Sequence, residues 1–260
     1  MTPAGAAGRR HRTDTDEEEG APAGTAGGAP PEMTPPRSAS LPEAVLFDMD
    51  GTLIDSEGMW GEAEAEVVAG LGGVWTAEDH RRNVGGAAEQ VGRYIAELTG
   101  SALGPREIIA RMQEAFGRRL AEGAPARPGA KELVTEVAAA GVPSALVTST
   151  ERMLVETAIG AIGLENFDLS VAGDEVERNK PDPCPYLKAA RLLGVDPARC
   201  VAFEDSPTGV ASALAAGCLT VAVPMMVPVE PADGLILLDT LDGVDLAWVR
   251  AAAAEHFGRG

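Results

Sequence analysis

The chain has 260 residues, of which 45% are hydrophobic and 23% are charged, and such values are ordinary for a globular protein with one large domain or a core domain and an insertion. Its formal net charge of −19 argues against a nucleic-acid partner, which needs a basic surface, but allows a small phosphorylated ligand near a local cation. Because no apolar stretch could span a bilayer and the three cysteines lack metal-binding spacing, we expect a cytoplasmic protein without a membrane anchor, zinc site or disulfide framework.

The first part of the chain, residues 1–41, differs in composition from the rest. It is dominated by Ala, Gly, Pro, Thr and Arg and contains an acidic run, Asp14–Glu19. A segment with so few large apolar residues cannot offset the entropy cost of ordering, so we predict a disordered tail. No apolar stretch follows its early arginines, so export is not expected, and Met33 is an alternative start.

Beyond the tail, short apolar runs alternate with helical patterns. The predicted buried strands are Ala44–Phe47, Ser144–Val147, Cys200–Phe203, Leu219–Val223 and Leu235–Leu238. The helices predicted between them are 130–140, 152–162, 185–193 and 208–216, and each is followed by a glycine, a common helix C-terminal signal. This alternation predicts an α/β fold, a doubly wound parallel sheet with helices on both faces.

The interval between the first two predicted strands is too long for a simple connection. It spans about 90 residues, whereas a crossover between parallel strands needs only a dozen or more. Helical patterns occupy 59–71, 87–98 and 105–121, separated by breaks that contain glycine. We therefore predict an α-helical cap inserted after the first strand. The predicted division is a tail at 1–41, a core at 42–57 and 127–260, and a cap at 58–126.

Polar side chains follow three of the predicted strands. Asp48 and Asp50 follow the first, Thr148–Thr150 the second, and Glu204 and Asp205 the third. In a parallel sheet these ends share one edge, where ligands bind, and alternation along the chain turns Asp48 and Asp50 the same way. Four carboxylates in one crevice would repel one another without a cation. Their oxygen ligands suit a hard divalent ion, with Mg²⁺ the leading choice.

The same residues offer the groups that phosphoryl transfer requires. Asp48 can act as a nucleophile that forms an aspartyl phosphate, and Asp50 can protonate the leaving oxygen and later activate water. Thr148 and Ser149, with nearby backbone amides, can bind the phosphoryl oxygens, and Lys180 can supply a positive charge. These are the predicted catalytic and phosphate-binding residues.

The residues at the strand ends resemble the motifs of the haloacid dehalogenase superfamily. The four matching segments are Asp48-x-Asp50-Gly51-Thr52-Leu53-x-Asp55-Ser56, Leu146-Val147-Thr148-Ser149, Lys180-Pro181-x-Pro183 and Phe203-Glu204-Asp205-Ser206-Pro207-x-Gly209. The resemblance covers residues 43 to about 240. It is similar to the branch with a helical cap after the first motif, which contains sugar phosphatases, phosphoglycolate phosphatase and β-phosphoglucomutase. It implies Mg²⁺ held by Asp48, the Asp50 carbonyl and Asp205, with Glu204 as a further ligand, and a cap that closes over the substrate.

Several of these residues have a second interpretation. Thr148 could instead cap a helix N-terminus, and Glu204 could be a structural partner of the cap hinge. Asp48-x-Asp50-Gly51 also resembles part of a calcium loop, but the glycine comes too early and a strand precedes it.

Four cap residues are candidate substrate contacts. Trp60 is close in sequence to the first motif, and the turn at Asn83, Gly85 and Gly86 is of the kind through which such caps contact a substrate. Packing inside the cap, or a plain helix connection, is the alternative for each of them.

The choice of reaction depends on two positions. Dehalogenases of the superfamily lack the second aspartate, so Asp50 favours phosphoryl transfer over carbon–halogen cleavage. Mutases of the β-phosphoglucomutase type usually carry a histidine twelve residues after the nucleophile, where this chain has Trp60, and the run Asp55–Trp60 looks more like sugar- and hexitol-phosphate phosphatases. We therefore predict a monomeric phosphatase for a small phosphorylated sugar or polyol. The alternatives are a phosphosugar mutase and a non-catalytic phosphate- or metal-binding protein on the same fold.

Overall fold

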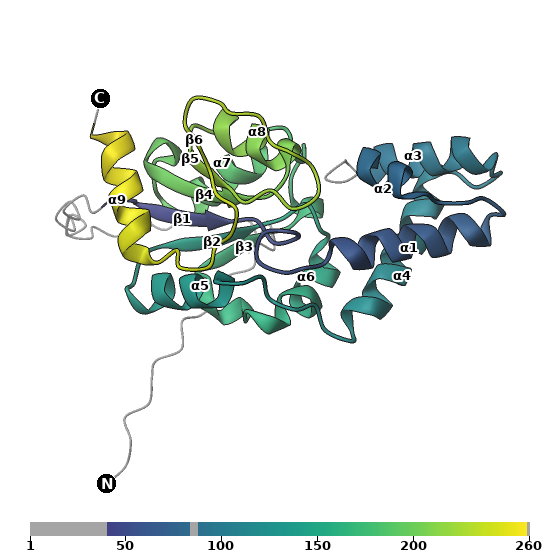
Figure 1. The fold of residues 1–260 in the computed structure, drawn as a ribbon, viewed down its shortest axis with the longest axis horizontal. Coiled ribbons are helices and arrows are strands. Elements are labelled where there is room, and N and C mark those ends of the chain that lie inside the picture. Colours follow the sequence, from purple (N-terminus) through teal and green to yellow (C-terminus); the bar gives the residue numbers. More distant parts are fainter. Residues whose placement is uncertain (1–40, 84–87, 259–260) are drawn as a thin grey trace, which may run out of the picture.

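The computed structural model describes residues 41–83 and 88–258. They contain a six-stranded sheet with the order β3-β2-β1-β4-β5-β6, in which every neighbouring pair is parallel (Figure 1). The strands are β1 (Ala44–Phe47), β2 (Ser144–Val147), β3 (Leu169–Val171), β4 (Cys200–Glu204), β5 (Leu219–Ala222) and β6 (Leu235–Leu237). Residues 1–40 of the predicted tail, with Met33, and the candidates Gly85 and Gly86 lie outside the described residues.

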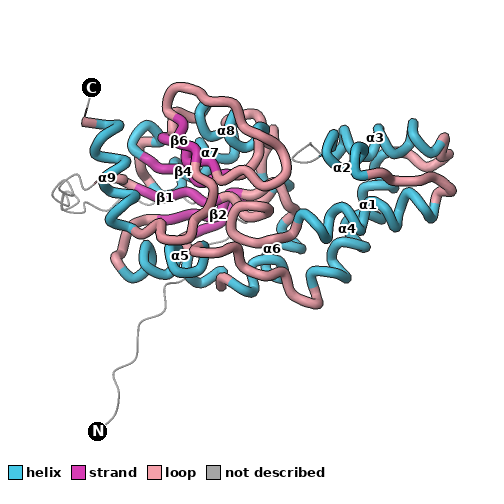
Figure 2. Tube along the Cα trace, in the orientation of Figure 1, coloured by secondary structure: helices cyan, strands magenta, loops and turns pink. Residues whose placement is uncertain are grey.

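Helices cover both faces of the sheet, which forms the middle layer in Figure 2. They are α5 (Ala130–Ala139) and α9 (Leu246–Phe257) on one face, and α7 (Cys184–Leu193) and α8 (Pro207–Ala215) on the other. In β1, Val45 and Phe47 pack with the first pair of helices, and Ala44 and Leu46 with the second. Since both faces are buried, the strand needs no polar alternation, and its continuous apolar run is explained. The predicted doubly wound α/β fold is confirmed.

Four further helices form a lobe that extends from the core (Figure 1). They are α1 (Glu57–Gly70), α2 (Ala77–Asn83), α3 (Ala88–Thr99) and α4 (Pro105–Leu120). Helix α4 packs against α1 and α3, and Trp60 of α1 stacks on Phe116 of α4 with ring centroids 3.8 Å apart. A helix, α6 (Arg152–Ala158), lies on the core side and contacts α4. The predicted helical insertion after the first strand is thus present, while its division at 58–126 stays a prediction.

The chain enters and leaves this lobe through two paired segments. Asp55 N donates a hydrogen bond to Pro125 O at 2.9 Å, and Arg127 N donates to Leu53 O at 2.8 Å. These two hydrogen bonds, with an antiparallel bridge between Ile54 and Ala126, tie the base of the lobe to the core.

Three of the strands and α-helices lie outside the predicted ranges: β3, α2 and α9. Strand β3 has only three residues, too few for a periodic signal. Helix α2 has no apolar stripe, but Thr76 N donates to Asp79 Oδ2 at 2.8 Å and Asp79 N donates to Thr76 Oγ1 at 3.2 Å. This reciprocal pair caps the N-terminus of α2. The spacing Thr76-x-x-Asp79 is therefore the sequence signal from which the start of this helix could have been predicted. Among the residues described, no helix is long and apolar enough to cross a membrane.

Candidate active site

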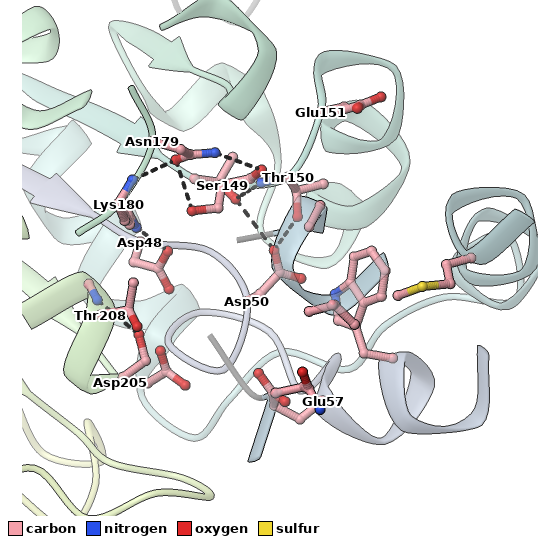
Figure 3. Close-up of a pocket in the computed structure, with 18 of the residues that line it drawn as sticks. Asp48, Asp50, Glu57, Ser149, Thr150, Glu151, Asn179, Lys180, Asp205 and Thr208 are labelled. Carbon is pink, nitrogen blue, oxygen red and sulfur yellow. Dashed lines mark hydrogen bonds and ion pairs between the residues drawn. The ribbon is translucent and has the colours of Figure 1, made fainter. Parts of the chain in front are cut away.

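The polar residues that follow β1, β2 and β4 meet at one edge of the sheet. Phe47, the last residue of β1, pairs with Leu146 of β2 and with Phe203 of β4, so the residues that follow these positions are neighbours. Figure 3 shows Asp48, Asp50 and Asp205 around one cavity, with Lys180 reaching Asp48. The structure therefore brings together the carboxylates and the lysine that the sequence separates by more than a hundred residues.

Asp48 is buried, and both of its carboxylate oxygens accept hydrogen bonds. Thr52 Oγ1 donates to Oδ2 at 2.8 Å, and Lys180 Nζ donates to Oδ1 at 2.6 Å. Lys180 is also buried and lies 2.8 Å from Glu204 Oε1. Burial alone would lower the pKa of Lys180, but the charges of Asp48 and Glu204 more than offset this and raise it. Lys180 therefore remains protonated and holds the Asp48 carboxylate in one orientation.

Asp50 has a different set of partners. Ser56 Oγ donates to its Oδ1 at 2.6 Å, and Thr150 Oγ1 donates to its Oδ2 at 2.6 Å, with Thr148 Oγ1 at 3.4 Å from the same oxygen. Burial raises the pKa of Asp50, the hydrogen bonds from Ser56 and Thr150 partly oppose this, and the charge of Asp48 adds to the increase. A carboxyl group that retains its proton more readily is suited to proton donation.

Three buried carboxylates, from Asp48, Glu204 and Asp205, each place an oxygen within 4.8 Å of the others. Burial and the charges of Asp48 and Glu204 raise the pKa of Asp205 well above its ordinary value. Such a group of oxygen ligands with like charges fits a hard divalent cation, which would remove the repulsion. The Asp50 side chain is not part of this group, because it is directed to Ser56 and Thr150.

Two glycines allow the acidic group to form. Gly51 has φ of +78°, and a Cβ at this position would lie 2.1 Å from Asp205 Oδ2. A Cβ at Gly209 would lie 1.9 Å from Glu204 Oε2. Both distances are far below van der Waals contact, so a larger residue would displace a carboxylate of the cluster.

The loop after β2 is linked to the loop that carries Lys180. Ser149 Oγ donates to Asn179 Oδ1 at 3.0 Å, and the same oxygen accepts from Lys180 N at 2.9 Å (Figure 3). Helix α6 begins at Arg152 with Glu151 as its N-cap, so Thr148 is not a helix N-cap. Thr148 and Ser149 both line the cavity together with Asp48, and their binding of phosphoryl oxygens stays a prediction.

The cavity lies between the edge of the sheet and the helical lobe. It contains about 1000 Å³ of space free of atoms, its open mouth included, which is enough for a small metabolite. Trp60 and Asn83 line it, together with the apolar side chains of Val91 and Met112. The ring of Trp60 packs on Phe116, as the packing alternative expects, and Trp60 also lines the cavity, while its contact with a substrate stays a prediction.

Several site residues were not predicted as such. Ser56 and Thr150 bind Asp50, Asn179 joins the two loops, and Tyr186 OH donates to Glu204 Oε1. A signal for Thr150 existed, since alternation after β2 places it on the side of Thr148. Tyr186 lies in a helix with no polar pattern that would mark it.

Glu57, Glu64 and His80 also line the cavity from the lobe and were not predicted. Their positions depend on how α1 and α2 pack, which local sequence does not reveal.

Comparison of the sequence with known proteins indicates one family. The family model for haloacid dehalogenase-like hydrolase matches residues 42–217. Protein CbbY from Rhodobacter capsulatus is 38% identical over 197 residues, which are 70% of this chain and 85% of that protein. Hexitol phosphatase A from Escherichia coli (strain K12) is 36% identical over 189 residues, 68% of this chain and 81% of that protein.

Solved structures agree with the sequence comparison. A mutant of CbbY from Rhodobacter sphaeroides, in complex with xylulose-(1,5)bisphosphate, matches with a TM-score of 0.71 and 33% identity, over 80% of this chain and 98% of that chain. The same protein in complex with phosphate matches with a TM-score of 0.72 and 32% identity, over the same shares of the two chains. The four motifs lie at the edge of a six-stranded parallel sheet, and the family model matches most of the chain. This chain therefore belongs to the haloacid dehalogenase-like hydrolases.

Proposed function

We propose that the chain is a Mg²⁺-dependent phosphatase that hydrolyses a small phosphorylated sugar or polyol through an aspartyl phosphate on Asp48. One observation carries the proposal: two aspartates on the floor of one cavity have opposite environments. Asp48 is ion-paired with Lys180 at 2.6 Å, whereas burial raises the pKa of Asp50. Groups whose environments differ in this way are suited to act as nucleophile and as general acid. The names of hexitol phosphatase A and of CbbY in complex with a sugar bisphosphate support the substrate class.

The proposed reaction has two steps. An oxygen of Asp48 attacks phosphorus, the bond to the ester oxygen breaks, and Asp50 gives its proton to that oxygen. Asp50 then takes a proton from water, whose oxygen attacks the phosphorus of the aspartyl phosphate, and this releases inorganic phosphate and restores Asp48. Thr148, Ser149 and Lys180 stabilise the charge on the phosphoryl oxygens.

Mg²⁺ is the proposed cofactor, because the donor set consists of oxygens only. Asp48 and Asp205 would hold it, with the Asp50 carbonyl that the family resemblance implies. Glu204 already accepts from Lys180 and Tyr186, so we assign it mainly to the orientation of Lys180. When bound, the ion supplies positive charge that offsets the charge of the phosphoryl group.

Hydrolysis is favoured over the mutase reaction by the position twelve residues after the nucleophile. Trp60 occupies it, stacked on Phe116 at an interplanar angle of 13°, and an indole ring supplies no acid or base there. With β-glucose 1-phosphate as substrate, we expect free phosphate rather than glucose 6-phosphate. Accumulation of glucose 6-phosphate would favour the mutase.

The nucleophile is tested by Asp48→Asn. We expect this variant to lose Mg²⁺-dependent release of phosphate from p-nitrophenyl phosphate, because an amide cannot form the aspartyl phosphate. Asp242→Asn, at an exposed position outside the cavity, is the matched control. Undiminished turnover by Asp48→Asn would contradict the assignment, and an inactive wild type would favour the non-catalytic alternative.

We also propose a cytoplasmic monomer with no nucleic-acid partner. The net charge of −19 argues against a nucleic-acid partner. The absence of a disulfide bond at Cys184, Cys200 and Cys218 supports a reducing compartment. Size-exclusion chromatography with light scattering tests the monomer, for which the expected mass is 26.7 kDa.

A further inference from the structure

Three titratable side chains of the helical lobe line the catalytic cavity: Glu57 and Glu64 of α1 and His80 of α2. His80 Nδ1 lies 2.6 Å from Glu64 Oε2, and Trp75 Nε1 donates to the same oxygen at 3.1 Å. Oε2 of Glu64 and one ring nitrogen of His80 are therefore satisfied within the lobe. The proposed reaction uses none of these groups.

Glu57 differs from Glu64 because no hydrogen-bond donor reaches it from the described part of the chain. Its side chain is only 10% exposed, and its nearest charged partner is His80 Nε2, at 3.9 Å from Oε2, which is beyond hydrogen-bond distance. Figure 3 shows its carboxylate across the cavity from Asn179. Burial and the charge of Asp50 raise the pKa of Glu57 to about 7. A donor from a ligand would satisfy this carboxylate.

Glu57 and His80 present complementary groups. The hydrogen bond to Glu64 raises the pKa of His80, which favours the form with protons on both nitrogens. His80 Nε2 is then a donor that lies 3.9 Å from the Glu57 acceptor oxygen. A hydroxyl group both donates and accepts, so one hydroxyl, or two on neighbouring carbons, can bind to this pair.

The charges around the cavity do not suit a second phosphate. Among the described residues that line it, the cationic side chains are Lys180 and His80. Lys180 is paired with Asp48 and Glu204 on the floor, and the remaining wall carries Glu57, Glu64 and Glu151. A phosphate on the far end of a substrate would face these carboxylates, which is unfavourable.

We propose that Glu57 and His80 form a subsite that hydrogen-bonds a hydroxyl group of the substrate, so that the enzyme selects neutral polyol or sugar monophosphates over bisphosphates. This inference rests on the proposed phosphatase function and names the substrate class more narrowly. It makes Glu57 a specificity-determining residue of the lobe.

The test compares substrates on the wild type and on Glu57 variants. Sorbitol 6-phosphate carries hydroxyls and p-nitrophenyl phosphate carries none, so the ratio of their kcat/KM values isolates the subsite. In Glu57→Ala we expect this ratio to fall about tenfold or more, because a hydrogen bond to a charged group is lost. Glu57→Gln keeps the shape and should lower the ratio less. Glu62→Ala is the control, since this glutamate of α1 is 72% exposed and pairs with Arg119.

The second arm compares fructose 6-phosphate with fructose 1,6-bisphosphate. We expect the wild type to prefer the monophosphate in kcat/KM by about tenfold or more, and Glu57→Lys to reduce this preference by adding a cation. An unchanged sorbitol ratio in both Glu57→Ala and Glu57→Gln, or a wild type that prefers the bisphosphate, would overturn the subsite. If the wild type hydrolyses p-nitrophenyl phosphate but none of the sugar or polyol phosphates, the proposed substrate class fails as well, and the two failures are distinguishable.

Discussion

At the scale of single residues, the two aspartates of the first motif show how partners assign roles to identical side chains. The Asp48 carboxylate accepts hydrogen bonds from Thr52 and from the buried ammonium group of Lys180. Asp50 accepts from Ser56 and Thr150, but burial outweighs these hydrogen bonds and raises its pKa. Lys180 and Thr150 are far from the two aspartates in sequence, and the sheet edge brings them together, so the difference could not be deduced from the spacing of the two aspartates alone.

The role of Asp50 as a proton donor is tested by Asp50→Asn. We expect kcat/KM for sorbitol 6-phosphate to fall by about 10²- to 10⁴-fold, the usual contribution of general acid–base catalysis. The loss with p-nitrophenyl phosphate should be smaller, because p-nitrophenolate leaves without a proton. A burst of p-nitrophenolate equal to the enzyme concentration should precede slow turnover, since Asn cannot activate water. Equal losses with both substrates would argue against the assignment.

The environment of Glu57 predicts a pH-dependent stability. Its pKa is raised from 4.5 to about 7 by burial and by the charge of Asp50. Its contribution to the free energy of unfolding is therefore complete below pH 4.5 and is lost as the pH rises through about 7. Relative to Glu57→Gln, the wild type should lose on the order of 2–3 kcal/mol across this range.

Urea unfolding of both proteins in metal-free buffer at several pH values measures this difference. Chelator is needed because a bound cation near Asp48 would offset the negative charges that act on Glu57. Glu62→Gln, at an exposed site on the same helix, is the reference. A difference between wild type and Glu57→Gln that does not change with pH would show that Glu57 is not desolvated.

At the scale of elements, apolar runs and helix-ending glycines predicted the order of most strands and helices. All five predicted strands are present, and four of them are fully buried, whereas β6 at the edge of the sheet is partly exposed. The prediction missed elements whose stability comes from contacts with neighbouring elements. Strand β3 has only three residues and is stabilised by its pairing with β2. Helix α2 is polar and is stabilised by its N-terminal cap and by contacts such as that of His80 with Glu64.

The same distinction between local and tertiary signals applies to the residues of the candidate site. Residues immediately after strands, such as Asp48, Thr148 and Asp205, could be predicted because parallel strands end at one edge. Glu57 and His80 could not, because they reach the cavity only through the packing of the lobe. The sequence does not reveal which face of the lobe lines the cavity.

Gly51 belongs to this scale because it sets the turn that leads from β1 to the lobe. In Gly51→Ala a Cβ would lie 2.1 Å from Asp205 Oδ2, at a φ of +78° that disfavours alanine. We expect a loss of at least about 1–2 kcal/mol in the free energy of unfolding and weaker Mg²⁺ binding. Gly58→Ala is the matched control, because nothing lies within 4 Å of its added Cβ. Thermal melts and Mg²⁺ titrations measure both, and equal behaviour of the two variants would refute this role for Gly51.

At the scale of the whole molecule, the cavity combines a rigid floor with a wall from the lobe. The floor is fixed by six parallel strands and buried ion pairs, so it can hold the reacting groups in place. The wall is attached through the paired segments at Asp55 and Arg127. This arrangement places the proposed catalytic residues in the core and the proposed substrate-selecting residues in the lobe.

The net charge of −19 and the three buried carboxylates predict that cations stabilise the folded protein. If Mg²⁺ binds the folded state alone, a concentration 100-fold above its Kd stabilises it by about 2.7 kcal/mol, and we expect the Tm to rise by roughly 5–10 °C. KCl at equal ionic strength is the control, because screening of the overall charge would act with either salt. In Asp205→Asn the metal-free Tm should rise, since burial and neighbouring charges raise the pKa of Asp205, while most of the shift caused by Mg²⁺ should disappear. An equal shift with KCl, or a full Mg²⁺ shift in Asp205→Asn, would mean that general screening rather than a bound ion stabilises the protein.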